Sequence, residues 1–360
     1  MRKHRYFALE KRLDIPLRIK LFVPVASIIA GFLFSAIFLL ITGDSPLEVY
    51  TVMLEGAFGS GYGLSETIVK MIPLMIISVG VSFAFKMQIW NAGGEGQLHI
   101  GAAAATYVVL HMNGSSRFLT ILVAVIAAFV CAGLYGLIPA ILKVKWKVNE
   151  LITCLMLNYV ATFLIAWLIQ GPWKDPTGFA FPRTRKFPES GELTTFFDSR
   201  IHTGLFIGLA IALILWFIIS KTRWGYEIKL IGAKEKVAQY SGISVNRNIL
   251  LVMFISAGIA GIAGMVEVCG ITHRLQANFA AQIGSSGMTI AYLAQCHPLA
   301  AVLVSFLFGG LLVGGNTIQK LGLPVSTVQM IQGSILIFVA AGAMFTNYKI
   351  VRKERRLGRG

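Results

Sequence analysis

The sequence predicts an all-α integral membrane protein with about ten transmembrane helices. Three observations predict this fold class: long apolar runs, a small share of charged residues, and basic residues that cluster between those runs. Of the 360 residues, 56% are hydrophobic and only 13% are charged, whereas a soluble domain averages about 25% charged residues. The net charge of +16 would suggest nucleic-acid binding in a soluble protein. Because the basic residues lie between apolar runs, they are more typical of loops that flank a membrane. We therefore expect no nucleic acid partner.

A helix that crosses a bilayer needs about 20 mostly apolar residues, and ten segments meet this requirement. Glycine and polar residues interrupt the third and the eighth segment, which predicts two broken helices. The first segment is longer than the apolar core of a signal peptide and has no evident cleavage site after it, so we expect a permanent helix. The ten expected spans are 21–42, 66–86, 88–111, 118–142, 149–170, 203–220, 249–271, 276–296, 298–316 and 325–346.

The basic residues predict the orientation of these spans, because positively charged loops stay in the cytoplasm. Four segments hold 22 of the 32 Lys and Arg residues, and ten crossings place all four on the same side. We therefore expect both termini in the cytoplasm. The four basic segments are residues 1–20, 143–147, 221–247 and 349–359.

This orientation gives one membrane domain with two basic ends. Residues 1–20 are the expected cytoplasmic N-terminus, residues 21–346 a single transmembrane domain, and residues 347–360 a basic cytoplasmic tail. The loop 171–202 has five basic and four acidic residues and is expected outside the cell. The loop 221–248 is expected in the cytoplasm.

Signatures of catalysis are absent from the sequence. It has no GxxxxGK[ST] loop for ATP, no HExxH motif and no GxSxG nucleophile elbow. The four cysteines form no CxxC pair, and the six histidines have no metal-ligand spacing. We therefore expect no catalytic residue, no metal site and no cofactor bound by this chain itself.

The segment Trp90–Gln97 (WNAGGEGQ) brings glycines and polar side chains into the third span. Broken helices offer backbone groups and helix dipoles to a polar solute near the membrane centre, which makes this segment a candidate solute pathway or gate. The alternative is a tight turn that enters the third helix, with Glu95 capping that helix or pairing with Lys86. The candidate residues are Trp90, Asn91, Glu95 and Gln97.

A second segment, Lys147–Tyr159, begins with Asn149 and Glu150, which are typical of a helix start. Asn158 lies two turns farther along, inside the fifth span, and needs a polar partner there. It either bonds a neighbouring helix or faces the solute pathway, and the sequence leaves both roles open.

The loop 221–248 contains a stretch, residues 233–240, that can form a short amphipathic helix punctuated by glycine at both ends. Such a helix would dock a cytoplasmic partner. The alternative is a solvated basic loop that serves only orientation. The residues expected to make the docking contact are Gly232, Ala233, Val237, Ala238, Tyr240, Gly242 and Ile243.

A run of small residues, 256–264, lets helices approach one another closely. Glu267 follows one turn later. A carboxylate at that depth is costly unless it is paired or faces water, so Glu267 is a further candidate for the pathway.

The segment Gln282–Gly287 is similar in kind to Trp90–Gln97, because small polar residues again break an apolar run. The two segments occupy the third span of each five-helix half. Paired broken helices in corresponding positions point to a solute site, which adds Gln282 and Ser285 to the candidates.

Four motifs in the same order resemble the permease subunits of bacterial ATP-binding-cassette (ABC) importers for simple sugars and nucleosides, within the branched-chain-type permease family. The resemblance covers most of residues 20–346. The motifs are WNAGGEGQ, KVNELITCLMLNYVA, RWGYEIKLIGAKEKVAQYSGISVNRN followed by SAGIAGIAGMVE, and GMTIAYLAQCHPLAAVLVSFLFGG.

This resemblance implies a ten-helix fold like that of the cobalamin-importer permeases, in the bacterial cytoplasmic membrane. Two permease chains, identical or different, would pair across a central pathway within the lipid bilayer. A cytoplasmic ABC ATPase, which holds the ATP and Mg²⁺, would dock on residues 233–243. An extracytoplasmic solute-binding protein, often a lipoprotein, would deliver the solute.

The motifs look most like the nucleoside branch of this family. A nucleoside site needs aromatic faces for the base and polar groups for the ribose, and Tyr292 joins Trp90, Tyr159 and Trp167 as a possible face. Membrane interfaces also collect such aromatic residues. The late motif departs from the family pattern at Tyr292 and Gln295, which leaves a simple sugar as the alternative solute.

The expected mechanism is alternating access driven by the partner ATPase. Two rival classes remain. A secondary transporter driven by an ion gradient would use Glu95 and Glu267. An integral membrane transferase would need a cluster of carboxylates or a metal site, which the sequence does not contain.

Overall fold

The computed structural model describes residues 4–11, 16–112, 114–178, 182–196, 199–280, 282–324 and 326–355. Within these residues the chain is mostly helical. The α-helices are α1 Leu17–Thr42, α2 Pro46–Phe58, α3 Gly61–Phe85, α4 Gly94–His111, α5 Arg117–Trp146, α6 Glu150–Gln170, α7 Gly204–Lys221, α8 Arg223–Ala233, α9 Glu235–Tyr240, α10 Val245–Glu267, α11 Ile283–Leu293, α12 Pro298–Ile318 and α13 Ser326–Asn347. The strands are β1 His4–Lys11 and β2 Tyr348–Arg355, and the short helical turns are Glu189–Gly191, Val268–Thr272 and Gln319–Leu321.

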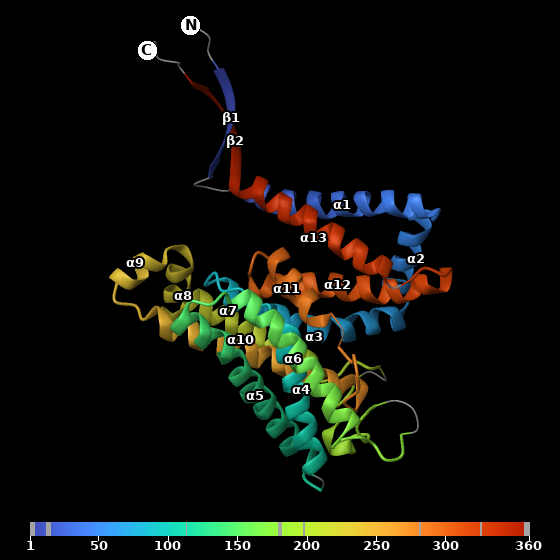
Figure 1. The fold of residues 1–360 in the computed structure, drawn as a ribbon. Coiled ribbons are helices and arrows are strands. Elements are labelled where there is room, and N and C mark those ends of the chain that lie inside the picture. Colours follow the sequence, from blue (N-terminus) through green and yellow to red (C-terminus); the bar gives the residue numbers. More distant parts are fainter. Residues whose placement is uncertain are drawn as a thin grey trace. The chain divides into compact units, whose positions relative to one another are not determined.

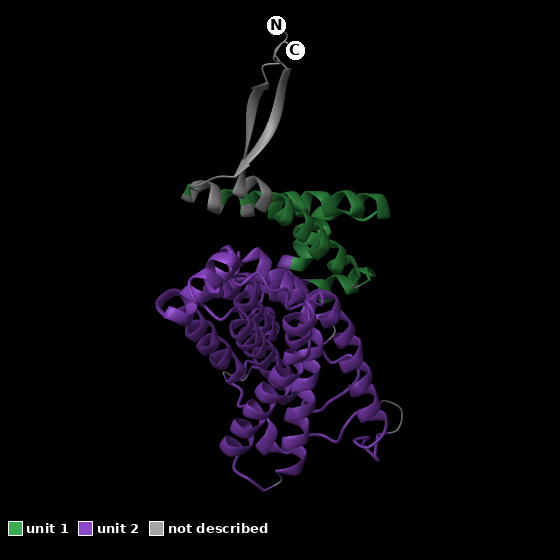
Figure 2. Cartoon of the chain, turned by 60° about the vertical axis from the view of Figure 1, so that its left-hand side comes forward, with its two compact units in different colours: residues 1–53, 315–360 green, residues 54–314 purple. Residues whose placement is uncertain are grey.

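The chain folds as two compact units, which Figure 2 colours separately. The first unit consists of residues 1–53 and 315–360 and joins the two ends of the chain. In it, α1 packs along α13, and β1 pairs antiparallel with β2 in the register His4↔Arg355 to Lys11↔Tyr348. The sequence predicts basic segments at both ends but gives no sign of this pairing.

The second unit, residues 54–314, is organised around α10, which packs against α3, α4 and α5 (Figure 1). Most of α10 is buried, and its small residues permit close crossings, as their spacing predicts. A Cβ atom added at Gly101 of α4 would overlap the backbone of Gly261, and one at Gly264 would overlap the carbonyl of Leu98.

The long helices largely match the expected spans. Within the described residues, seven helices are long and apolar enough to cross a membrane, namely α1, α3, α5, α6, α7, α10 with the turn that follows it, and α12. The apolar part of α13, Ser326–Gly342, is shorter. The structure also contains α2, which the sequence analysis does not anticipate.

The two expected spans with breaks differ most from expectation. In the span expected at 88–111, the helix begins only at Gly94, after a turn in which Gln88 has a φ of 59°. In the span expected at 276–296, α11 has 11 residues, about 16 Å of helix. Asn278 and Gln282 precede it with φ of 53° and 65°. In both spans irregular residues therefore precede the helix, and in the second span Gln295 and Cys296, with φ of 51° and 56°, also follow it.

The crossing of α4 and α10 generates a first prediction. We expect Gly101→Ala to lower the free energy of unfolding by about 1–3 kcal/mol, because overpacking a close crossing costs this much. The measurement is the melting temperature of the purified chain in detergent. The matched control is Gly61→Ala, where an added Cβ meets nothing within 4 Å. Equal melting temperatures of the two variants would contradict the prediction.

Candidate functional site

A buried pair of amides holds the turn that leads into α4. The Asn91 and Gln97 side chains exchange two hydrogen bonds: Asn91 Nδ2 donates to Gln97 Oε1 at 3.0 Å, and Gln97 Nε2 donates to Asn91 Oδ1 at 2.8 Å. Asn91 Nδ2 also donates to Ser256 Oγ on α10 at 2.8 Å. All three side chains are buried, so these bonds fix the turn to α10 where water cannot replace them.

Asn158, on α6, holds the same turn from another side. Its Oδ1 accepts from the Gly96 N–H at 2.8 Å, and its Nδ2 donates to the Ala92 carbonyl at 2.9 Å. The first N–H groups of a helix have no intrahelical acceptor, so Asn158 satisfies one of those of α4. Of the two roles that the sequence leaves open for Asn158, the bond to a neighbouring helix is present.

Trp90, which precedes Asn91 in this turn, lies beside Glu150 at the start of α6. Glu150 forms an ion pair of 2.5 Å with Lys143 on α5, and its Oε1 lies 3.5 Å from the Trp90 N–H. Asn149 caps α6 as its position predicts, since its Oδ1 accepts from the Leu151 N–H at 2.9 Å. The Trp90 side chain is 42% exposed.

The starts of α4 and α11 meet. Glu95, in the first turn of α4, accepts a hydrogen bond through Oε1 from the Gln282 N–H, at 3.1 Å. The approach is close because Gly284 has no side chain, and a Cβ there would overlap the backbone of Glu95. The two glycine-rich segments that the sequence analysis singles out, 90–97 and 282–287, are therefore neighbours in space.

Polar groups with accessible surface gather at this crossing. Gln282 and Ser285 are exposed, and Glu95 is half-buried. Tyr292, also half-buried, lies near the other end of α11. Ser285 Oγ donates to the Gln282 carbonyl at 3.0 Å. The N-terminal ends of two helices, which carry partial positive charge, stabilise the Glu95 carboxylate. The crossing thus offers hydrogen-bond donors and acceptors to a polar solute.

Glu267 lies apart from this crossing. It ends α10, about three turns after Ser256. It is 1% exposed, and its Oε2 has no hydrogen-bond partner within the described residues. The structure therefore does not join Glu267 to the amides of Asn91 and Gln97.

The expected coupling loop folds as two helices, α8 and α9, joined at Lys234. Ala238 is fully buried, whereas Val237 is 43% exposed and Tyr240 is 90% exposed. The apolar residues of α9 thus divide into one that packs against its own chain and two that face outward. Of the other expected contact residues, Ala233 and Gly242 are exposed, and Gly232 and Ile243 are half-buried.

Three contacts anchor α8 to the rest of the second unit. Trp224 Nε1 donates to Asn248 Oδ1 on α10 at 2.6 Å, and the Trp224 ring packs against Phe83 near the end of α3 with 5.4 Å between centroids. At the other end, Gly232 lies so close to Lys86 that an added Cβ would overlap the Lys86 carbonyl. The helix α8 therefore connects α9 to the turn that leads to Asn91.

Sequence reasoning misses Ser256, Trp224 and Asn248. Ser256 figures there only as one of a run of small residues, although a hydroxyl in an apolar run is a signal that a partner is needed. Trp224 and Asn248 flank the coupling loop at both ends, and only the fold brings them together.

Comparison with known proteins identifies the family. A family model described as "Branched-chain amino acid transport system / permease component" matches residues 63–340. The guanosine ABC transporter permease protein NupP of Bacillus subtilis (strain 168) is 34% identical over 89% of this chain and 93% of its own length. The glucose ABC transporter permease protein TsgB13 of Haloferax volcanii is 29% identical over 95% of this chain and 93% of its own length. The nucleoside ABC transporter permease protein NupB of Lactococcus lactis subsp. cremoris is 29% identical over 89% of this chain and 91% of its own length.

These matches confirm the resemblance that the four motifs carry. The apolar helices of the described residues agree with a multi-pass protein of the cytoplasmic membrane. The chain belongs to the family of permease components of branched-chain amino acid transport systems.

Proposed function

We propose that this chain is the membrane-spanning permease subunit of an ABC importer that moves nucleosides into the cell. The observation that carries the proposal is the 34% identity, over 89% of the chain, to a relative named for guanosine transport. A relative named for nucleoside transport, 29% identical over 89% of the chain, supports the same solute class. The relative named for glucose transport, 29% identical over 95% of the chain, makes a simple sugar the second candidate.

The proposed topology has ten crossings in a fold like that of the cobalamin-importer permeases, with residues 1–20 and 347–360 in the cytoplasm. The antiparallel pairing of β1 with β2 supports an even number of crossings, because chain ends that pair lie on the same side of a membrane. The loop 171–202 then lies outside. The irregular segments before α4 and α11 are tolerated at membrane depth where they are buried in protein, as Asn91 is, or line a water-filled pathway, as proposed for the exposed Gln282.

The solute pathway is proposed to run past the crossing of α4 and α11. Asn91 and Gln97 are buried and satisfy each other, so they act on the gate by holding its shape, as Asn158 does from α6. The residues with accessible surface supply the ring faces, donors and acceptors that a base and a ribose need. These solute-facing residues are Trp90, Glu95, Gln282, Ser285 and Tyr292. Glu267 is proposed as a second gate at the far end of α10.

The energy for transport is proposed to come from a partner ATPase, which holds the ATP and Mg²⁺. Val237 and Tyr240 form the outward docking contact, and α8 passes the motion through Gly232 to the turn at Lys86. The other partners are an extracytoplasmic solute-binding protein and a second permease chain. Exposed apolar side chains on α5 and α6, such as Phe118 (78% exposed) and Phe163 (71% exposed), fit lipid or that second chain.

The proposal predicts solute uptake that depends on the complete complex. Proteoliposomes that contain this chain, its permease partner, the ATPase and the binding protein should accumulate radiolabelled guanosine only when ATP reaches the ATPase. Unlabelled guanosine should compete, and glucose should not.

The same proteoliposomes without the ATPase serve as the control and should show no uptake. Competition by glucose but not by guanosine would assign the chain to simple sugars. Uptake that follows an ion gradient without ATPase would overturn the ABC importer proposal.

The docking contact predicts a selective effect of Tyr240. We expect Tyr240→Ala to weaken ATPase binding about tenfold or more, because an exposed aromatic residue at an interface centre is a typical hot spot. The measurement is the affinity of the purified ATPase for the chain in nanodiscs. Tyr62→Ala, at a tyrosine that is 73% exposed near the start of α3, is the matched control. Equal affinities for both variants would remove α9 as the docking site.

The amide pair predicts strong coupling between Asn91 and Gln97. In a double-mutant cycle with Asn91→Ala and Gln97→Ala, we expect each single change to lower stability and the double change to cost less than their sum. The coupling should be about 0.5–3 kcal/mol, as for residues in one hydrogen-bond network. Thermal melting and guanosine uptake of the four proteins measure it. Additive effects would show that the two amides act independently.

A further inference from the structure

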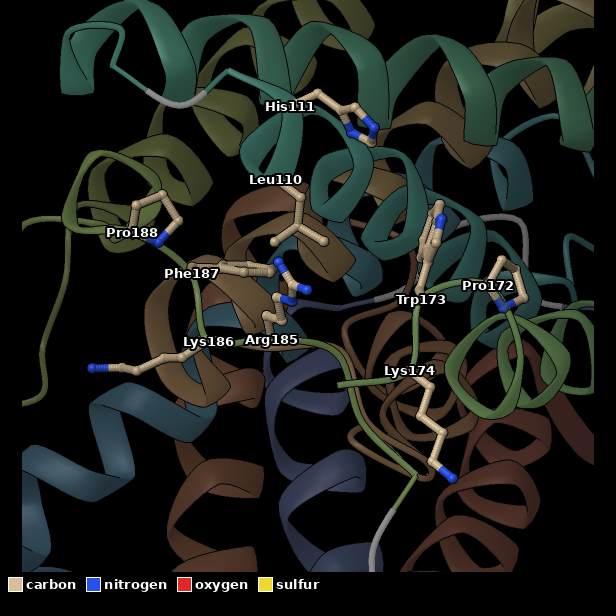
Figure 3. A pocket seen from close by; sticks show the side chains of 9 residues that line it. All are labelled: Leu110, His111, Pro172, Trp173, Lys174, Arg185, Lys186, Phe187 and Pro188. Atoms are coloured by element: carbon tan, nitrogen blue, oxygen red, sulfur yellow. The ribbon is translucent and has the colours of Figure 1, made fainter. Parts of the chain in front are cut away.

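The segment between α6 and α7 holds a cavity that none of the proposed transport residues line. Its volume is about 570 Å³, within the range of pockets that bind small molecules. Its walls come from the end of α4, the turn after α6 and the segment 185–188 (Figure 3). The lining residues are Leu110, His111, Pro172, Trp173, Lys174, Arg185, Lys186, Phe187 and Pro188.

One cation of this cavity points into it. Figure 3 shows the Arg185 guanidinium between Phe187 and Trp173, whereas Lys174 and Lys186 extend away. Lys186 is paired with Glu192 at 3.4 Å. Within the described part of the chain, no carboxylate forms an ion pair with Arg185. The cavity lining contains no acidic residue.

Asp175, which follows the lining residue Lys174, is engaged within its own turn. Asp175 Oδ1 accepts from the Thr177 N–H at 3.0 Å and from Thr177 Oγ1 at 2.7 Å. These hydrogen bonds lower the pKa of the Asp175 carboxyl, and the charges of Arg183 and Arg185 add to the effect. Asp175 is thus bonded to its own turn and attracts Arg185 only at longer range, without forming an ion pair with it.

A flat aromatic wall stands beside the guanidinium. The Trp173 ring lies 6.2 Å from the Tyr107 ring at an interplanar angle of 31°, and the Tyr107 ring lies 4.1 Å from the His111 ring at 31°. The Trp173 N–H bonds the Leu168 carbonyl at 2.9 Å, which ties this wall to the end of α6. An anion that also carries a flat or apolar portion would use both features.

We propose that this cavity is a phosphate site, which binds a molecule carrying a phosphate group through Arg185 and packs the rest of that molecule against Trp173. The planar guanidinium matches phosphate oxygens with paired N–H donors. Two sources share this chemistry. One is a soluble nucleoside phosphate, and the other is the headgroup of an anionic phospholipid.

The lipid source has a structural basis in α6. Its outer face is apolar and exposed, with Phe163 71% and Trp167 62% exposed, and the helix leads directly into the cavity wall at Pro172–Lys174. Tryptophan and basic residues at the end of an apolar helix are typical of the membrane interface. A headgroup at that level would reach Arg185 while its acyl chains stay beside α6.

A competing explanation is that the cations only complement helix dipoles. The carboxyl ends of α4 and α6 both border the cavity and carry partial negative charge, which attracts basic side chains. In that case Arg185 contributes to stability and has no affinity for phosphate. The experiment must therefore separate binding from stability.

The test uses the whole chain in nanodiscs, without the ATPase, and two arms distinguish the sources. In the first arm, phosphatidylcholine nanodiscs are titrated with guanosine monophosphate, guanosine and inorganic phosphate. In the second arm, the chain is purified from membranes that contain phosphatidylglycerol, and native mass spectrometry detects the retained lipid. Both arms compare the unchanged chain with Arg185→Ala and Arg185→Lys. The matched control is Lys186→Ala, at the lysine that points away and is paired with Glu192.

We expect the unchanged chain to bind guanosine monophosphate more tightly than guanosine, or to retain phosphatidylglycerol. Arg185→Ala should weaken that binding about 10- to 100-fold, the range for hydrogen bonds to a charged group. Arg185→Lys should keep part of it, and Lys186→Ala should bind as the unchanged chain does. Rising salt should weaken binding of the soluble ligand.

The phosphate site would be overturned if Arg185→Ala and Lys186→Ala bind equally well in both arms. It would also be overturned if neither the unchanged chain nor any variant binds in either arm. A lower melting temperature of Arg185→Ala with unchanged binding would assign Arg185 to the helix ends. Because binding is measured without the ATPase, a negative result here leaves the proposed importer function standing.

Discussion

The central constraint on this fold is that the backbone at the start of α4 must be hydrogen-bonded in a place that water does not reach. The chain leaves helical geometry at Lys86 and resumes it at Gly94, and the groups exposed in between need partners. Side-chain amides supply them: Asn91 Oδ1, held by Gln97, accepts from the Gly93 N–H, and Asn158 bonds the Gly96 N–H and the Ala92 carbonyl. Because these amides come from α6 and from α4 itself, and Asn91 also bonds α10, the turn has one position in the bundle. That position brings Glu95 to the start of α11.

The same turn is also where α8 meets the buried helices of the second unit. On one side, Lys86 is in backbone contact with Gly232 at the end of α8. On the other side, five residues later, Asn91 bonds Ser256 of α10. A displacement of α8 would therefore act on a segment whose far end is bonded to α10, which is largely buried. Trp224 attaches α8 to both Phe83 of α3 and Asn248 of α10.

Composition and apolar runs predict most of the long helices. A helix that crosses a membrane needs about 20 apolar residues whether it faces lipid or is buried among other helices. They do not predict α2, whose 13 residues are too few for a span and include Glu48 and Glu55. The glycines of Trp90–Gln97 indicate an irregular segment, but its partners Asn158 and Ser256 lie far away in sequence and follow no period. Whether Ala238 or Tyr240 faces outward is likewise undetermined by sequence, because α9 has only six residues and the tertiary contacts choose its buried side.

The division of α9 into two faces has a consequence for how the permease can change its partner. Val237 and Tyr240 face outward. With an ATPase docked on α9 as proposed, substitutions there would alter which ATPase surface is complementary while the packing inside this chain stays intact. Ala238 and Gly232 touch their own chain, and substitutions there disturb the internal linkage whatever ATPase is present. In the proposed importer, compatibility with the ATPase and transmission into the membrane would thus be encoded at separate positions. A permease of this design could acquire a different ATPase through a few exposed residues and keep its solute pathway unchanged.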